Sequence, residues 1–257
     1  MLEFKNINVS FNKGTVDHTD LFTDFNLKVE KGEFVSIVGS NGSGKTTLLN
    51  LVAGSVNPDS GKILLADEDM TSKREFVRAR RIGRVFQSPS LGCAGNMTIA
   101  ENMSIAENKI SGYGLQFGLN KKKIELYKEI LQPLGLGLEN RINVPVCSLS
   151  GGQRQLLSLI TATLTPIDLL LLDEHTAALD PVAAEETMRL TDKIVCEKGV
   201  TTLMVTHNLR FAVEYGNRLI MMDKGRIVVD VRGEEKVKLK VTDLLDTFNN
   251  ISIECGN

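Results

Sequence analysis

The stretch GSNGSGKT, from Gly39 to Thr46, limits what this chain can fold into more than any other part of the sequence. It matches the pattern G-x-x-x-x-G-K-[ST], whose glycines let successive backbone N–H groups face phosphate oxygens without a clash from a Cβ atom. The apolar run EFVSIV precedes the motif, and the helical segment KTTLLNLVAG follows it. This strand–loop–helix order predicts a phosphate-binding loop, or P-loop, at the positive end of a helix.

The side chains of this P-loop suit a nucleoside triphosphate that carries a magnesium ion. Lys45 can reach the outer phosphates, and the hydroxyl of Thr46 can ligate Mg²⁺. By itself the motif predicts nucleotide binding and no particular reaction. The residues expected to hold the nucleotide are Gly39, Ser40, Asn41, Gly42, Ser43, Gly44, Lys45, Thr46 and Thr47.

Hydrophobic patterning predicts an α/β fold around this loop. The segments LEFKNINVSF and FTDFNLKVEKG alternate apolar and polar residues, which is typical of antiparallel strands exposed on one face. Farther along, apolar strands alternate with helices and predict a mostly parallel sheet covered on both faces. The expected strands are EFVSIVG, GKILLAD, RIGRVFQ, IDLLLLD, TTLMVTH, NRLIMMD and RIVVD, and the expected further helices are TIAENMSIAEN, KKKIELYKEILQPLG, PVAAEETMRLTDKIVCEKG and VTDLLDTFNN.

The residue pattern changes between Ser88 and about Thr165, where loops interrupted by glycine and polar helical segments replace the apolar strand patterns. We therefore expect one domain over residues 1–257. Its nucleotide-binding core would comprise residues 1–87 and 166–257, and residues 88–165 would form an inserted all-helical subdomain.

Bulk composition narrows the function classes. A net charge of −2 gives no global attraction to nucleic acid, which argues against a nucleic-acid partner. The cysteines Cys93, Cys147, Cys196 and Cys255 are scattered, which argues against a metal knuckle or a disulfide framework and suits a reducing compartment. No apolar run approaches the roughly 18 residues of a membrane span. If the chain works at a membrane, a partner must hold it there.

A carboxylate pair follows the apolar run in LLLLDE, at Asp173 and Glu174. Ligands of open α/β sheets lie at the carboxyl ends of strands, so Asp173 would hold Mg²⁺ through water and Glu174 would orient or deprotonate the attacking water. The alternative is an acidic turn that caps the next segment. His207 ends another strand and could bond the γ-phosphate, or it could be structural. Gln87 could contact Mg²⁺ or the attacking water, or it could be a surface glutamine.

The segment SLSGGQRQLLSL, from Ser148 to Leu159, raises the question of why one chain would carry a second pair of glycines suited to phosphate. The answer comes from an ordered set of motifs: GSNGSGKT, Gln87, LSGGQ at Leu149–Gln153, LLLLDE, ALD at Ala178–Asp180, and His207. With this set the sequence resembles the ATP-binding-cassette (ABC) ATPases over essentially its whole length.

The resemblance implies a head-to-tail dimer, in which each ATP lies between the P-loop of one subunit and the LSGGQ signature of the other. Signature residues Ser150, Gly151, Gly152 and Gln153 would contact the γ-phosphate across the interface. Asp180 would signal between the two sites.

Two further positions depend on the same resemblance. Phe11 is the candidate for the aromatic residue that stacks on adenine, although Phe4 lies close to it in the sequence. The family often has proline after the Asp-Glu pair, where this chain has His175. This histidine is interpreted as a turn residue or, alternatively, as a group that tunes the pH response of the site.

The resemblance further implies the motor subunit of a membrane transporter, bound to permease subunits at the cytoplasmic face of a bacterial membrane. The irregular segment Ser88–Asn96 would border the groove for a helix of the permease, or would be an ordinary loop. A separate single cassette favours an importer fed by a substrate-binding protein. The segments LGLGLENRINVPV, LLSLITATLTP and DEHTAALDP resemble uptake systems for tryptophan or tyrosine. A soluble ATPase of the iron–sulfur assembly type, an exporter and a lipoprotein-release system are the alternatives.

Overall fold

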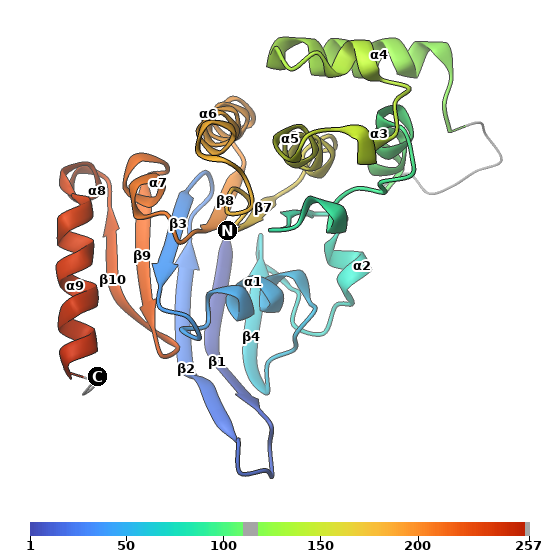
Figure 1. Cartoon of the computed structure of the whole chain (residues 1–257). Coiled ribbons are helices and arrows are strands. Elements are labelled where there is room, and N and C mark those ends of the chain that lie inside the picture. Colours follow the sequence, from blue (N-terminus) through green and yellow to red (C-terminus); the bar gives the residue numbers. More distant parts are fainter. Residues whose placement is uncertain (110–117, 255–257) are drawn as a thin grey trace. The chain divides into compact units, whose positions relative to one another are not determined.

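Residues 1–109 and 118–254 are described by the computed structural model (Figure 1). Cys255 lies outside the described residues. The chain divides into two units, which we call unit 1 (Met1–Arg78 and Gly199–Asn257) and unit 2 (Ala79–Lys198). Each is described by itself. The predicted boundaries at residues 88 and 165 remain predictions.

An antiparallel sheet of unit 1 has the strand order β2-β1-β4-β5. Along β2 the alternate residues Phe25, Leu27 and Val29 are buried while their neighbours are exposed, which is the one-sided pattern expected from the sequence. These strands are β1 (Leu2–Phe11), β2 (Thr19–Val29), β4 (Ser60–Leu65) and β5 (Glu68–Asp69).

A second sheet contributes the strand order β10-β9-β3-β8 to unit 1. β3 runs parallel to both β8 and β9, and only β10 is antiparallel to its neighbour. Every residue of β3 and β8 is buried, as expected for central parallel strands. The strands are β3 (Phe34–Gly39), β8 (Thr201–Val205), β9 (Arg218–Asp223) and β10 (Arg226–Arg232).

Helices of unit 1 follow these strands. The P-loop helix is α1 (Lys45–Ala53), and the C-terminal helix α9 (Val241–Glu254) lies alongside β10 in Figure 1. Leu244 of α9 is buried in a cluster with Val38 of β3 and Leu219 of β9. The short helices are α2 (Glu75–Arg78), α7 (Leu209–Glu214) and α8 (Glu234–Lys238).

Unit 2 contains a parallel strand pair and a group of helices. The pair is β6 (Ile82–Val85) and β7 (Leu169–Asp173), with Val85 opposite Leu172. The main helices are α3 (Ile99–Asn108), α4 (Lys121–Leu131), α5 (Gly151–Ala162) and α6 (Pro181–Lys198). Single 3-10 turns lie at Pro89–Leu91, Gln132–Leu134, Leu138–Arg141 and Val146–Ser148.

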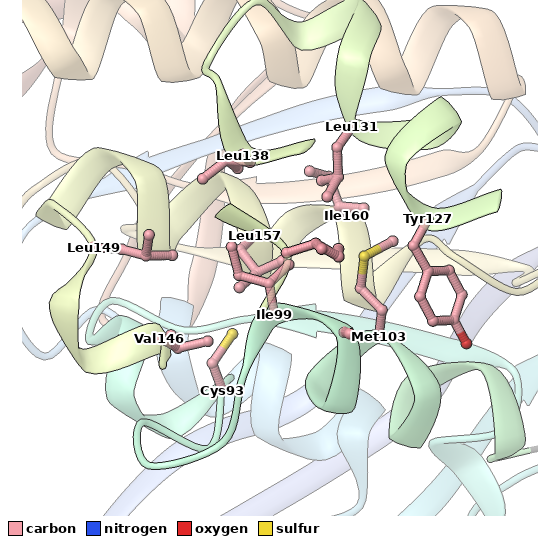
Figure 2. Packing of buried hydrophobic residues seen from close by; sticks show 12 residues of the cluster. Cys93, Ile99, Met103, Tyr127, Leu131, Leu138, Val146, Leu149, Leu157 and Ile160 are labelled. Carbon is pink, nitrogen blue, oxygen red and sulfur yellow. The ribbon is translucent and has the colours of Figure 1, made fainter. Parts of the chain in front are cut away.

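Figure 2 shows the core of the helical part of unit 2. Tyr127 of α4 and Met103 of α3 are fully buried there with Leu157 of α5. The Tyr127 hydroxyl donates to Glu107 Oε2 at 2.6 Å, so the one polar tip in this group has a partner. The described residues between 88 and 165 form helices and turns, and their one β-type pairing is an isolated bridge between Thr98 and Pro145. The α/β fold with an N-terminal antiparallel sheet and an inserted helical region is confirmed.

No helix among the described residues is long and apolar enough to cross a membrane.

Candidate nucleotide site

The P-loop follows β3 and leads into α1, as predicted. Its glycines are required for two different reasons, the lack of space for a Cβ atom and a positive φ angle. A Cβ on Gly39 would lie 2.2 Å from the Met222 carbonyl oxygen, and one on Gly44 would lie 2.9 Å from the Phe22 ring. Gly42 has open space around it but a φ of 79°, which L side chains rarely adopt. The helix that follows has no side-chain cap and no acidic residue in its first turn, so its N-terminal N–H groups suit an anion.

Lys45 is 5% exposed and folds back over the loop. Its ammonium group donates to the carbonyl oxygens of Gly39 at 2.9 Å and Ser40 at 2.8 Å. The positive charge therefore lies inside the curve of the loop. Ser43 is buried, and Ser40, Asn41 and Thr46 are exposed, with Thr47 half-buried. The hydroxyl of Thr46 can therefore be reached by a ligand.

The turn between β9 and β10 braces the same loop. Ser40 Oγ donates to Asp223 Oδ1 at 3.0 Å, and Gly225 N donates to the Ser43 carbonyl at 3.0 Å. A Cβ on Gly225 would lie 1.6 Å from the Leu21 carbonyl oxygen, so no other residue fits without a backbone shift. The shape of the P-loop thus depends on residues some 180 positions away.

His207 lies beside the P-loop strand. In the parallel pairing of β3 with β8, Ile37 is opposite Val205. Two residues farther along each strand, His207 therefore comes level with Gly39, the first residue of the P-loop. The next residue, Asn208, caps α7 by accepting from the backbone of Arg210 and Phe211. His207 itself is exposed at this strand end.

Phe11 ends β1 opposite Thr19 of β2 and is 38% exposed. The same hairpin carries Phe22, whose ring lies against Gly44. The other aromatic candidate, Phe4, is 1% exposed and packs against the ring of Phe25 at 6.0 Å between centroids. Of the two, only Phe11 offers a ring face to a ligand.

In unit 2, the carboxylate pair follows β7. Asp173 is 9% exposed, and its Oδ2 accepts from Arg84 Nη2 at 3.1 Å. Arg84 also covers the Phe86 ring, with its guanidinium carbon 4.7 Å from the centroid. Glu174 is half-buried and has a φ of 46°, a conformation that costs a non-glycine residue about 1 kcal/mol or more. The surrounding contacts must hold this residue in place.

Gln87 is exposed two residues after the end of β6. The register of β6 with β7 brings it to the same edge as Glu174, because Val85 is opposite Leu172. The preceding Phe86 carbonyl accepts from Gln155 Nε2 of α5 at 2.9 Å. The signature helix therefore anchors the chain next to Gln87.

The signature motif forms the start of α5. Ser150 is the N-cap, and its Oγ accepts from Gln153 N at 3.2 Å while Gln153 Oε1 accepts from Ser150 N at 3.2 Å. In this capping box Ser150 Oγ accepts one hydrogen bond, and its O–H can still donate to an anion. A Cβ on Gly151 or Gly152 would lie 3.3 Å from Leu179 or Ala183, which is tight packing against the start of α6.

Asp180 caps that helix. Its Oδ1 accepts from the backbone N–H groups of Val182 and Ala183, both at 3.1 Å. The carboxylate therefore has a structural function at the N-terminus of α6, beside any signalling function.

His175 is 2% exposed, and burial lowers its pKa to about 4. Its Nε2 lies 3.3 Å from Thr191 Oγ1 of α6. An imidazole with such a low pKa stays neutral near pH 7, so the interpretation of His175 as a group that tunes the pH response near neutrality is wrong. The histidine is a buried turn residue.

The predicted residues thus fall into two groups. Unit 1 brings together the P-loop, His207 and the hairpin of Phe11, and unit 2 brings together Gln87, Asp173, Glu174 and the signature. Two contacting residues were missed, Arg84 and Asp223. Asp223 follows a buried strand, the same signal that selected Asp173, and Arg84 is a basic residue in an otherwise apolar strand.

A triphosphate and a magnesium ion fit the chemistry of these residues. The P-loop offers N–H groups in a bend where side chains would clash, and Lys45 adds a cation. The Thr46 hydroxyl, the Asp173 carboxylate and the Gln87 amide are oxygen donors, which Mg²⁺ prefers.

Comparison with known proteins gives a consistent result. The sequence model of a family described as ABC transporter matches residues 22–177. The chain is 47% identical over 248 residues to the tyrosine transport ATP-binding protein of Clostridioides difficile (strain R20291), covering 96% of this chain and 98% of the relative. It is 34% identical to the phosphonates import ATP-binding protein PhnC of Lactococcus lactis subsp. cremoris (strain SK11), covering 93% and 96%.

Solved structures agree with this likeness. The ADP conformation of MJ1267, an ATP-binding cassette of an ABC transporter, superposes with a TM-score of 0.80 at 27% identity, covering 100% of this chain and 99% of that one. The dimeric post-hydrolysis state of the cassette MJ0796 with ADP and Pi gives a TM-score of 0.76 at 28% identity, covering 90% and 98%.

Proposed function

This chain belongs to the ABC transporter family and is an ATP-hydrolysing cassette, and from that premise we propose that it drives a bacterial importer of an aromatic amino acid, with tyrosine as the first candidate. The observation that carries the proposal is the 47% identity to a tyrosine transport ATP-binding protein over nearly the full length of both chains. Relatives named for phosphonate and polyamine import support the direction of transport.

The P-loop would bind the triphosphate of ATP, with Lys45 on its outer phosphates and Phe11 under the adenine. Thr46, Gln87 and Asp173 would supply the protein's oxygen donors to Mg²⁺. When bound, that ion would neutralise charge on the phosphates. The core would comprise residues 1–87 and 166–257, and the signature subdomain residues 88–165.

Hydrolysis would depend on Glu174 as the general base. Glu174 lies directly after β7 with a left-handed backbone, and its carboxylate would take a proton from the attacking water. His207 would donate a hydrogen bond to the γ-phosphate. These roles explain why both residues lie at strand ends rather than in the buried core.

Two chains would close head to tail around the nucleotides. Ser150 is poised to donate its hydroxyl hydrogen to a phosphate, because its oxygen already accepts within the capping box. Gly151, Gly152 and Gln153 would place the N-terminus of α5 against the same phosphate. Since the γ-phosphate would join the two faces, its loss would release them. The dimeric cassette of MJ0796 supports this arrangement.

Permease subunits would bind this dimer and hold it at the cytoplasmic face of the membrane. Segment Ser88–Asn96 would border the docking groove, and its Leu91 is 69% exposed, as a docking residue would be. A substrate-binding protein would deliver the amino acid to the permease from the other side, and no residue of the cassette would touch it.

The test is purification of the tagged chain from native bacterial membranes, followed by reconstitution of the co-purified proteins into liposomes. We expect an integral membrane permease in the complex and ATP-dependent uptake of labelled tyrosine. A complex prepared with Glu174→Gln is the matched control, since it should bind ATP but lose roughly 10²-fold in turnover.

Other outcomes would replace the proposal. Capture of soluble iron–sulfur assembly proteins alone would indicate the soluble ATPase. Uptake of a phosphonate or a polyamine, but not of tyrosine or tryptophan, would retain the importer and change its substrate. Movement of substrate out of inside-loaded vesicles would indicate an exporter.

A further inference from the structure

His175 and Thr191 form a buried polar contact beside the catalytic carboxylate of unit 2. His175 directly follows Glu174, where family members often have proline, and Thr191 is 0% exposed on α6. A buried imidazole without a hydrogen-bond partner would destabilise the fold, so the contact with Thr191 matters for this turn.

The direction of this hydrogen bond follows from the neighbouring one. Thr191 Oγ1 donates its single hydrogen to the Thr187 carbonyl at 2.7 Å. It must therefore accept from His175, whose Nε2 lies 3.3 Å away. Nε2 of His175 therefore carries a proton and donates it to Thr191.

This contact attaches the turn after Glu174 to α6 at a second point. The chain itself enters α6 at Pro181, and Thr191 lies about 15 Å farther along the helix axis. Hydrogen bonds inside the turn, such as the one that Ala177 N donates to the Glu174 carbonyl at 2.9 Å, fix the shape of the turn but not its orientation relative to α6. A turn held at two separated points of one helix cannot swing about its junction.

Glu174 needs such a restraint, because its φ of 46° lies in a region that non-glycine residues rarely occupy. We propose that His175 is a positioning residue, which through its Nε2–H bond to Thr191 holds the Glu174 carboxylate in the direction required for water activation. The inference rests on the proposed role of Glu174 as general base.

The experiment compares Thr191→Val with Thr187→Val in the full-length chain. Both changes replace a buried hydroxyl of α6 by a methyl group one helical turn apart, but the Thr187 hydroxyl makes no hydrogen bond. We expect Thr191→Val to lower kcat for ATP by about tenfold, as misplacement of a reacting group does, with KM and the affinity for a fluorescent ATP analogue unchanged within about twofold. Thr187→Val should retain the kcat of the parent chain.

Two conservative variants test rescue. Thr191→Ser keeps the acceptor, and His175→Gln keeps an N–H donor of similar reach, so both should retain most of kcat. If Thr191→Val fails to fold by circular dichroism, His175→Ala takes its place, with His175→Gln as its folded comparison.

The proposal is overturned if Thr191→Val hydrolyses ATP like the parent chain, or if Thr191→Val and Thr187→Val lose kcat equally. Glu174→Gln, measured in parallel, separates this failure from the failure of the base assignment. A fully active Glu174→Gln chain would refute the base itself, whereas an inactive one beside a fully active Thr191→Val chain would refute only the positioning role.

Discussion

Asp223 illustrates how a single residue far from a motif in sequence can decide the shape of that motif. It accepts from Ser40, the first variable position of the P-loop, while Gly225 bonds the Ser43 carbonyl from the same turn. These two bonds hold both sides of the loop against the end of β9. A loop that is held in its binding conformation before ATP arrives loses less entropy on binding.

We expect Asp223→Ala to weaken ATP binding by roughly three- to tenfold, the equivalent of one lost hydrogen bond of about 1 kcal/mol. Titration with a fluorescent nucleotide would measure it. Asp223→Asn retains an acceptor and is the control, with a smaller loss expected. Ser40→Ala removes the donor of the same bond, so additive losses in the Ser40→Ala/Asp223→Ala chain would contradict the explanation.

Arg218 gives unit 1 a pH-dependent contribution to stability. It is 2% exposed, donates twice to Asp230 at 2.8 and 2.7 Å, and contacts Glu33 at 2.9 Å. The Arg218 guanidinium lowers the pKa of Asp230 below its usual value of 3.8. A carboxyl group with a lower pKa in the folded state stabilises the fold above the unfolded pKa, and this contribution is lost as pH falls through the folded pKa.

Accordingly, Asp230→Asn should lower the free energy of unfolding most at neutral pH. The difference from the parent chain should shrink as pH falls below about 4, where the carboxyl group of the unfolded chain begins to bind a proton, and should be lost as pH falls through the lower pKa of the folded chain. Urea unfolding followed by circular dichroism between pH 7 and pH 3 would measure both. A difference that stays constant over this range would show that Asp230 acts by packing rather than by charge.

At the scale of elements, the glycines of the signature serve packing, beside the phosphate contact that we propose for them. Alanine normally stabilises a helix relative to glycine. Here a Cβ on Gly152 would lie 3.3 Å from the Ala183 methyl, so α5 and the start of α6 can approach this closely only without a side chain. The same close approach aligns the turn of Glu174 with the signature inside unit 2.

The end of α7 depends on a buried lysine from α8. Lys236 is 3% exposed and donates to the carbonyls of Val213, Tyr215 and Gly216 at 2.7, 2.7 and 2.9 Å. These carbonyls lie at the negative end of the helix, where a cation is stabilised. One ammonium group therefore satisfies a helix end and fixes the segment that leads into α9.

Replacement of this lysine should be costly. We expect Lys236→Met to lower the free energy of unfolding by about 2 kcal/mol or more, because three acceptors lose a charged donor. Lys238→Met, in the same helix but with a side chain 79% exposed, should change it by no more than about 0.5 kcal/mol. Urea unfolding of both variants would measure the change. Equal losses of unfolding free energy would show that the helix propensity of residues in α8, and not the buried hydrogen bonds, is responsible.

Local patterns predicted most of these elements but not the contacts between them. Strands such as β3 and β7 are short and mostly apolar runs, and α5 and α6 have clear starts, so sequence alone located them. The missed elements β5, α2, α7 and α8 are two to six residues long, too short for a period to show. His175 was open to a wrong pH interpretation because the local sequence does not show that its ring is buried and contacts Thr191, sixteen residues away in α6.

For the whole molecule, the central expectation is that one chain supplies only part of each ATP site. Ser150→Arg should abolish hydrolysis while the isolated monomer keeps its nucleotide affinity, because the signature serves the partner's nucleotide. Ser148→Arg, an exposed position two residues earlier, is the matched control and should remain active. Phosphate release and nucleotide titration measure the two quantities.

A mixture of two inactive variants tests more directly whether each ATP site needs residues of both chains. In a head-to-tail dimer of one Ser150→Arg chain and one Glu174→Gln chain, one of the two sites combines an intact Glu174 with an intact Ser150. Two inactive proteins mixed in equal amounts should therefore recover up to about a quarter of the parent activity if the sites are independent. Loss of nucleotide affinity in monomeric Ser150→Arg would instead mean that both motifs act within one chain.

The ion pair between Arg84 and Asp173 has an electrostatic consequence for the catalytic cycle. The carboxylate of Asp173 at the end of β7 is compensated by the guanidinium of Arg84, 3.1 Å away. A divalent cation that binds Asp173, as we propose for Mg²⁺, would have to displace this resident positive charge, so its net gain in free energy would be smaller than at an unpaired carboxylate.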